Sequence, residues 1–211
     1  MQDIFQYISM FSALLPITFY FLFNSRFESS KWLLYYLLVC FCFEILFLSV
    51  NKGLLNVDPH YLIHAFIILE FSFISIYFFR QNILPANLWC VISFISLLIY
   101  FCLFLVDKGL FEFNTIGCAL FSIVLIAYCI LGFKQLIQRS IPVFLEKTAF
   151  FWVICALLLF FSGSFFIYVF KAYIAKLDDS LYKTLWLYVH DGLIIFKCTF
   201  IAVSFTRKIE K

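Results

Sequence analysis

The sequence predicts an all-α protein, a polytopic membrane helical bundle with seven transmembrane helices. Of its 211 residues, 65% are hydrophobic and only 13% are charged, and the mean hydropathy is +1.06. Seven apolar runs reach or approach the roughly 20 residues that a helix needs to cross about 30 Å of hydrocarbon. A soluble domain of this length could not bury 32 phenylalanines and 12 tyrosines in one core. We therefore expect lipid to surround most of the chain.

The first four predicted helices cover residues 4–23, 32–50, 61–79 and 88–106. Pro16 lies inside the first run, where its missing N–H frees a carbonyl, so we expect a kink there. No Lys or Arg precedes this run, so it is expected to stay as a spanning helix and not to be a cleaved signal. Each run is followed by polar or charged residues that end helices, at 24–26, 51–53, 80–82 and 107–109.

The last three predicted helices cover residues 114–133, 150–170 and 185–205. The connections 134–147 and 171–184 carry a proline or paired aspartates, which favour helix ends. Few connections are long enough to fold alone, so residues 1–211 are expected to form a single domain. Tryptophan rings prefer the headgroup level of a bilayer, and all four lie near the start of a predicted helix: Trp32, Trp89, Trp152 and Trp186.

The distribution of Lys and Arg predicts the orientation, because cytoplasmic loops retain positive charge. The N-terminus and the second, fourth and sixth loops hold five such residues: Lys52, Lys108, Lys171, Lys176 and Lys183. The other loops and the C-terminal tail hold nine: Arg26, Lys31, Arg80, Lys134, Arg139, Lys147, Arg207, Lys208 and Lys211. This bias predicts the N-terminus outside and the C-terminus in the cytoplasm, in the bacterial inner (cytoplasmic) membrane.

Ionisable side chains inside the apolar runs are the strongest functional signal, because charges in a bilayer are costly and mark ligand sites or proton relays. Glu44, Glu70, Asp191 and Lys197 are such residues. Asp191 points about 100° away from His190, which shares a helix face with Lys197, so direct pairing of Asp191 with Lys197 is not favoured. We expect a charged Lys197 to pair with Glu70 or Glu44 on a facing helix. Without a partner, the lysine would lose its proton.

Seven residues form the predicted ligand-binding or proton-relay set: Glu44, Glu70, His190, Asp191, Lys197, Ser162 and Ser164. By helix rise, most of them lie in the outer half of the bilayer. Ser162 and Ser164 flank Gly163, and such small residues let helices approach closely. The functional hypothesis is an outward-facing polar pocket. The alternative is that these groups only fix the packing of the helices.

Several other chemistries have little support. The basic residues are scattered and the net charge is +3, so nucleic-acid binding is not expected. All eight cysteines lie in apolar runs without metal-ligand spacing, and no metal site is predicted. No phosphate loop, nucleophile elbow or HExxH motif occurs, so catalytic residues stay unknown and an enzyme is the less favoured alternative.

Two groups of short motifs resemble a known set of proteins. The matching positions are 151–152, 161–166, 185–186 and His190, together with His64, 70–71, 111–112 and Asn114. They are similar to uncharacterised small seven-helix inner-membrane proteins of Bacteroidota, a resemblance that implies a multi-pass protein encoded near two-component signalling genes. The acidic residue of that pattern is missing at Ala119 or Leu120.

Lys197 also invites comparison with the lysine that forms a retinal Schiff base in microbial rhodopsins. Here Asp191 precedes Lys197 by six positions instead of four, and the third helix lacks the expected Arg and Asp pattern. Retinal on Lys197 is therefore a disfavoured alternative, and otherwise no cofactor is predicted.

The predicted function is a sensory or signal-relaying membrane component that works with a membrane or kinase signalling partner. A small transporter or ion or proton channel, including a membrane effector of phage defence, is the first alternative. An intramembrane lipid-modifying enzyme is the second, with Asp191, His190 and Glu70 as acid and base groups.

Overall fold

A computed structural model describes residues 2–23, 28–106, 114–139, 145–177, 184 and 186–207. Within this part of the chain, seven helices are long and apolar enough to cross a membrane, and the predicted all-helical architecture is confirmed to that extent. The helices are α1 (Gln2–Phe11), α2 (Leu14–Leu22), α3 (Glu28–Asn51), α4 (Pro59–Arg80), α5 (Ala86–Val106), α6 (Thr115–Arg139), η2 (Leu145–Lys147), α7 (Ala149–Leu177), η3 (Trp186–His190) and α9 (Asp191–Phe205).

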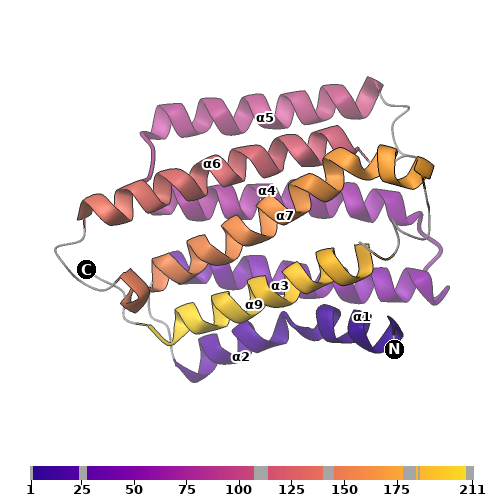
Figure 1. Cartoon of the computed structure of the whole chain (residues 1–211), viewed down its shortest axis with the longest axis horizontal. Helices are drawn as coiled ribbons and strands as arrows, with labels where there is room; N and C mark the ends of the chain where they lie inside the picture. The colour runs from indigo at the N-terminus through magenta and orange to yellow at the C-terminus, as the bar shows by residue number, and fades with distance from the viewer. Residues whose placement is uncertain are drawn as a thin grey trace.

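Successive spans run in opposite directions in one bundle, with α1 and α2 together forming the first span (Figure 1). We call the end that holds Gln2 the N-terminal end, and the end that holds Phe205 the C-terminal end. Helix α9 packs against α2 and α7, and α7 packs against α6. Helices α3 and α4 pack against each other, while α5 lies at the edge of the bundle against α6 and α4 (Figure 1).

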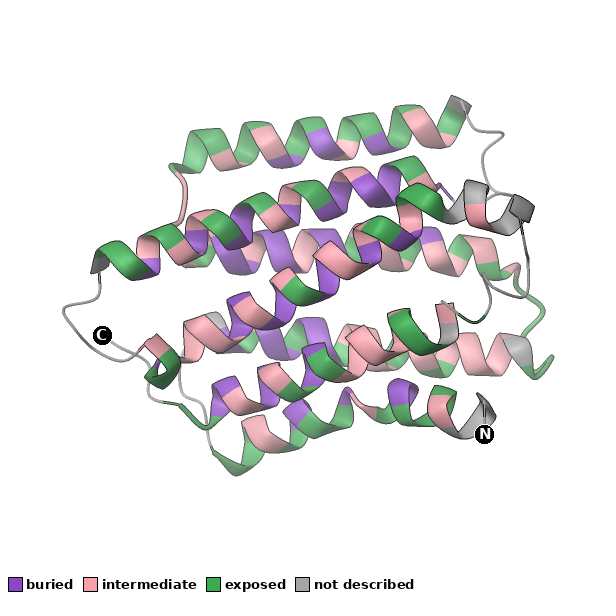
Figure 2. Cartoon of the chain, in the orientation of Figure 1, coloured by how far each residue is buried: buried purple, intermediate pink, exposed green. Residues whose placement is uncertain are grey.

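Long side chains fill the space among α3, α4, α7 and α9. The Phe150 ring of α7 lies 6.3 Å from the Tyr77 ring and 6.5 Å from the Phe78 ring of α4. Buried residues gather on the inward faces of these helices, whereas α5 is exposed along most of its length (Figure 2). Only 11% of the α5 span is buried, against 50% of the α6 span, as expected for a helix that faces lipid.

The first predicted helix is broken between α1 and α2, which confirms the kink expected from Pro16. The break lies at Ser12 and Ala13, one turn before the proline. Proline has no N–H to donate to the Ser12 carbonyl four residues earlier. That carbonyl instead accepts from Leu15 N at 3.1 Å, and the Ser12 hydroxyl donates to the Ser9 carbonyl at 2.6 Å.

Two helix starts are fixed by capping side chains. Asp58 accepts a hydrogen bond from His60 N at 2.9 Å, and Pro59 occupies the first turn of α4, where a missing N–H has no cost. Asn114 accepts from Gly117 N at 2.8 Å at the start of α6. The Asp58 cap and Pro59 explain why α4 begins two residues before the predicted position 61.

Most helices are longer than the predicted spans, and α3 begins at Glu28 instead of residue 32. Two helices extend well past their predicted C-terminal ends. Helix α6 continues to Arg139 instead of residue 133, and α7 to Leu177 instead of residue 170. Hydropathy marks the limit of the apolar stretch, but the backbone hydrogen bonds of a helix can continue past it, with basic side chains reaching toward water. The predicted connections at 24–26 and 107–109, Pro142, and Asp178 and Asp179 lie outside the described residues.

The seventh predicted span begins with a π-helical turn. Residues Trp186–His190 form η3, and the regular helix α9 starts at Asp191. The Trp186 and His190 rings are stacked, with centroids 4.5 Å apart and an interplanar angle of 15°. A π turn is rare and is often found at functional sites. His190 is the last residue of this turn and Asp191 is the first of α9.

Candidate functional site

Three polar side chains meet in the middle of the bundle, and we call them the central cluster: Tyr36, Glu70 and Lys197. Lys197 Nζ donates to Tyr36 Oη at 2.7 Å and to Glu70 Oε1 at 3.2 Å. Tyr36 Oη in turn donates to Glu70 Oε1 at 2.8 Å. The phenol therefore accepts from the ammonium and donates to the carboxylate, so the three groups close a ring of hydrogen bonds.

The Lys197 ammonium also lies against an aromatic face. Its Nζ is 3.8 Å from the centroid of the Phe160 ring on α7, a cation–π distance. The lysine side chain is 5% exposed and that of Glu70 is 10% exposed. Removing two charges from water is costly, and the pair is tolerated because the carboxylate, the phenol and the ring surround the ammonium. The cluster connects α3, α4 and α9, and Phe160 brings α7 into contact with it.

The expected pairing of Lys197 with an acid on a facing helix is confirmed for Glu70. Glu44 lies on α3, two turns from Tyr36, and is half-buried. It is within electrostatic range of Asp191, Lys197 and Glu70. These four predicted residues therefore share one interior region, in which Glu70 and Lys197 form the direct contact.

His190 and Asp191 lie at the start of α9, nearer the N-terminal end of the bundle. His190 Nδ1 is 3.8 Å from Asp191 Oδ1, and the two side chains are 12% and 13% exposed. The His190 ring contacts Trp186 and also lies 5.8 Å from the Phe160 ring. Phe160 thus contacts both Lys197 of the central cluster and His190, which lies nearer the N-terminal end of the bundle.

The two predicted serines play different roles. Ser162 donates to the Leu158 carbonyl of its own helix at 2.6 Å. Ser164 is fully buried, and its Oγ has no hydrogen-bond partner among the described residues. Between them, a Cβ atom on Gly163 would lie 2.4 Å from Leu193 Cδ1. The expected close approach of helices at this glycine is confirmed, and it brings α7 against α9.

The sequence prediction missed Tyr36 and Phe160. Tyr36, Cys40 and Glu44 are spaced four residues apart, so they share one face of α3. The Cys40 thiol lies beside the Tyr36 phenol. This repeat of polar groups at helical spacing was a usable signal. Phe160 gave none, because it is one of 32 phenylalanines and its ring becomes special only through the contact with Lys197.

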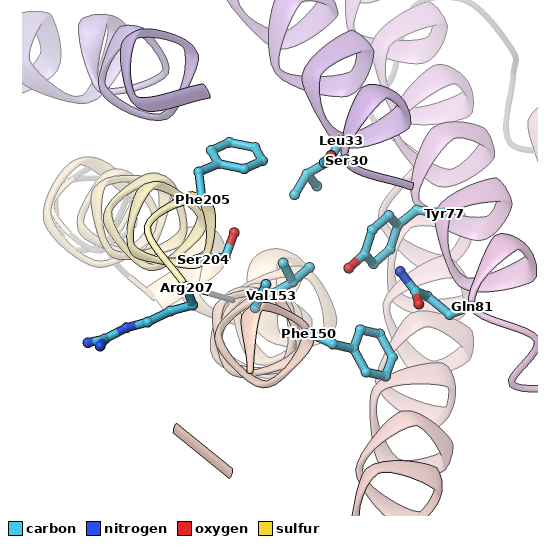
Figure 3. A pocket seen from close by; sticks show the side chains of 10 residues that line it. Ser30, Leu33, Tyr77, Gln81, Phe150, Val153, Ser204, Phe205 and Arg207 are labelled. Carbon is cyan, nitrogen blue, oxygen red and sulfur yellow. The ribbon is translucent and has the colours of Figure 1, made fainter. Parts of the chain in front are cut away.

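A small pocket of about 50 Å³ opens at the C-terminal end of the bundle (Figure 3). None of the seven predicted residues lines it. Tyr77, Gln81 and Ser204 provide polar groups, while the Arg207 side chain is directed away from the interior (Figure 3). The remaining lining residues are Ser30, Leu33, Ala149, Phe150, Val153 and Phe205. The pocket is thus mostly neutral and large enough for a few water molecules.

His64 and His190 have different surroundings in the bundle. His64 Nδ1 is 2.8 Å from Tyr100 Oη, and its ring lies 4.9 Å from that of Phe104 on α5. His190 is instead packed among aromatic rings of α7 and η3. Within the described residues, no group of three or more His, Cys, Asp or Glu side chains could hold a metal ion.

Comparison with known proteins finds no match to this chain. No protein-family model matches the chain, and no curated protein or solved structure is similar to it. The function is therefore argued from the side chains and their contacts.

Proposed function

We propose that the protein is a membrane-embedded signal-relaying component in which the central cluster acts as a two-state element. The observation that carries this proposal is the buried Lys197–Glu70 ion pair, which joins α4 and α9 at 3.2 Å. A buried ion pair is weak evidence for stability, because hydrophobic residues of similar size often serve as well. Ionisable groups at membrane depth more often serve a function.

The switch would operate by neutralising one member of the pair. When Glu70 loses its charge, Lys197 loses the only direct carboxylate contact that it makes within the described part of the chain, and its ammonium must find another partner or leave the interior. Glu44 and Asp191 are the acids that face this region from α3 and α9. A shift of Lys197 toward them would move α9 relative to α4, and such a discrete rearrangement is what relays a signal.

The orientation and the partner are parts of the same proposal. We place the N-terminus outside and the C-terminus in the cytoplasm of the bacterial inner membrane. The support is the distribution of Lys and Arg, with nine on the side of the C-terminal tail and five on the side of the N-terminus. The described connections 52–58 and 81–85 are too short to hold an output domain. A membrane or kinase signalling partner would then carry the output.

The orientation predicts which connections an impermeant thiol reagent can reach. In a cysteine-free background, Asn56→Cys is expected to be labelled in intact cells, because residue 56 is exposed between α3 and α4. Gln138→Cys, exposed at the opposite end of the bundle, is expected to be labelled only after the membrane is permeabilised. The reverse pattern would place the C-terminus outside.

The switch predicts a local change in thiol reactivity. Cys198 follows Lys197 and is 2% exposed. In a variant that keeps only this cysteine, Glu70→Gln is expected to raise the rate of maleimide labelling by about tenfold, as for an opening that becomes about 1.4 kcal/mol easier. Gln keeps the volume of Glu but removes its charge, so it mimics the neutral state.

A second single-cysteine variant provides the control. Cys129 on α6 is also fully buried but lies outside the central cluster. Its labelling rate is expected to stay the same in the Glu70→Gln background. Equal increases at both cysteines would mean that the bundle is loosened as a whole, and an unchanged rate at Cys198 would mean that the cluster does not switch. Either result contradicts the proposal.

A further inference from the structure

The central cluster and the pocket at the C-terminal end lie on the same faces of the same helices. Glu70 and Tyr77 are seven residues apart on α4, and Lys197 and Ser204 are seven residues apart on α9. Residues at this spacing are nearly eclipsed and about 10 Å apart along a helix. Tyr77 and Ser204 line the pocket (Figure 3). The two polar levels are therefore stacked along one axis of the bundle.

Helix α7, which contributes the Phe160 ring, has the same seven-residue spacing between the cluster and the pocket. Phe160, which contacts Lys197, lies seven residues after Val153, which lines the pocket. On α3, Leu33 of the pocket precedes Tyr36 of the cluster by three residues. All four helices that surround the cluster thus also surround the pocket. The pocket lies about two turns nearer the C-terminal end along α4, α7 and α9, and about one turn nearer along α3.

A dry layer of aliphatic side chains separates the two levels, and we call it the apolar layer: Ile74, Leu157 and Ile201. Each lies three or four residues from a cluster contact and from a pocket residue on its own helix. Their exposed fractions are 1%, 0% and 0%, and they belong to one packed cluster with Tyr36, Phe160 and Tyr77. Hydrophobic constrictions of this kind close aqueous pathways by excluding water.

The N-terminal side of the central cluster is more polar. Glu44 and Asp191 lie within electrostatic range of each other, and Glu44 also of Lys197 and Glu70. The side chains of His190 and Asp191 are partly exposed. Titratable groups thus continue from the cluster toward one end of the bundle, whereas the apolar layer blocks the other end.

We propose that the bundle contains a proton pathway in which the central cluster is the binding station and the apolar layer is the gate. This inference goes beyond signal relay and requires no partner protein. The ligand is a proton carried by carboxylates and water. Protons enter past Asp191 and Glu44, and they leave through the pocket when the layer opens.

One turn of the pathway conserves protons and charge. The Glu44 carboxyl gives its proton to the Glu70 carboxylate, which weakens the pair with Lys197. When water crosses the apolar layer, the Lys197 ammonium releases one proton to water in the pocket. The Glu70 carboxyl then gives its proton to the Lys197 amine, which restores the original pair. Water on the N-terminal side, past Asp191, then gives one proton to the Glu44 carboxylate. With this step one proton has entered, one has left, and all three side chains are in their starting states.

The test introduces a polar side chain into the apolar layer, so that water can cross it. The purified full chain is reconstituted into liposomes that contain a trapped pH-sensitive dye, and a potassium gradient with valinomycin drives protons inward. Ile201→Ser places a hydroxyl in the apolar layer and is expected to raise proton flux about tenfold over the wild-type protein. Adding Glu70→Leu and Lys197→Met to Ile201→Ser is expected to return the flux to the wild-type level.

A matched substitution controls for general damage. Ile154 is also fully buried, but it faces α6, where its Cδ1 would lie 3.0 Å from a Cβ on Gly132. Ile154→Ser is expected to leave the flux unchanged. Equal flux through both serine variants, flux that persists without the charged pair, or no increase with Ile201→Ser overturns the proposal. If Ile201→Ser does not give a monodisperse helical protein, Ile74→Thr tests the same layer with a smaller change.

Discussion

Replacing Lys197 with Met is expected to lower the free energy of unfolding by about 3–5 kcal/mol, because the substitution leaves the Glu70 carboxylate buried without its counter-charge. The carboxylate would retain the Tyr36 hydrogen bond, which at 2.8 Å compensates only part of the loss. The measurement is reversible unfolding in mixed detergent micelles, followed by circular dichroism. Lys134→Met, at an exposed position of α6, is the control and is expected to change the free energy by less than about 0.5 kcal/mol.

Removing both charges is expected to restore most of that stability. In the double variant Lys197→Met with Glu70→Leu, no charge has to be buried, and the two apolar side chains can pack against Phe160. If the loss in the double variant equals the sum of the losses in the two single variants, the side chains are not coupled and each contributes to packing on its own. That result would favour a purely structural role for the central cluster over a switch.

The charged core of the site could be predicted because membrane depth makes ionisable groups conspicuous. Glu70 and Lys197 stand out in apolar runs, and helical spacing already excluded Asp191 as the favoured partner. Tyr36 carries a weaker signal, because its hydroxyl adds little polarity to a large apolar ring and it is one of 12 tyrosines. Its spacing from Cys40 and Glu44 marks its helix face, but its contact with Lys197 depends on how the facing helices are placed.

Among the helix ends and interruptions, some also follow from the local sequence and others depend on packing between helices. The break before Pro16 follows from the missing N–H of proline, which can be read from the residue type alone. The π turn Trp186–His190 has no such local cause, and it depends on how the rings of Trp186 and His190 stack against each other and against α7. Likewise, the stacking of the pocket under the central cluster depends on the register between four helices, which no single helix encodes.

Replacing Gly117 with Ala is expected to destabilise the protein by about 1–3 kcal/mol, although alanine favours a helix. The added Cβ would lie 2.6 Å from Asn114 Nδ2 and 2.6 Å from Tyr100 Cδ2. Neither group can move without cost. Asn114 caps α6 through Gly117 N, and Tyr100 is 1% exposed, stacked at 4.7 Å on Phe121 and hydrogen-bonded to His64.

Gly192→Ala provides the matched comparison. Its added Cβ meets no described atom within 4 Å beyond the neighbouring residues of its own helix, and the residue occupies the first turn of α9. There the gain in helix propensity should act alone and stabilise the protein by about 0.5–1 kcal/mol. Thermal unfolding of both variants in the same detergent measures the difference. If Gly117→Ala were as stable as Gly192→Ala, the contact of α6 with Tyr100 would have to be looser than the structure has it. The tight start of α6 is therefore tested separately from the charged centre of the bundle.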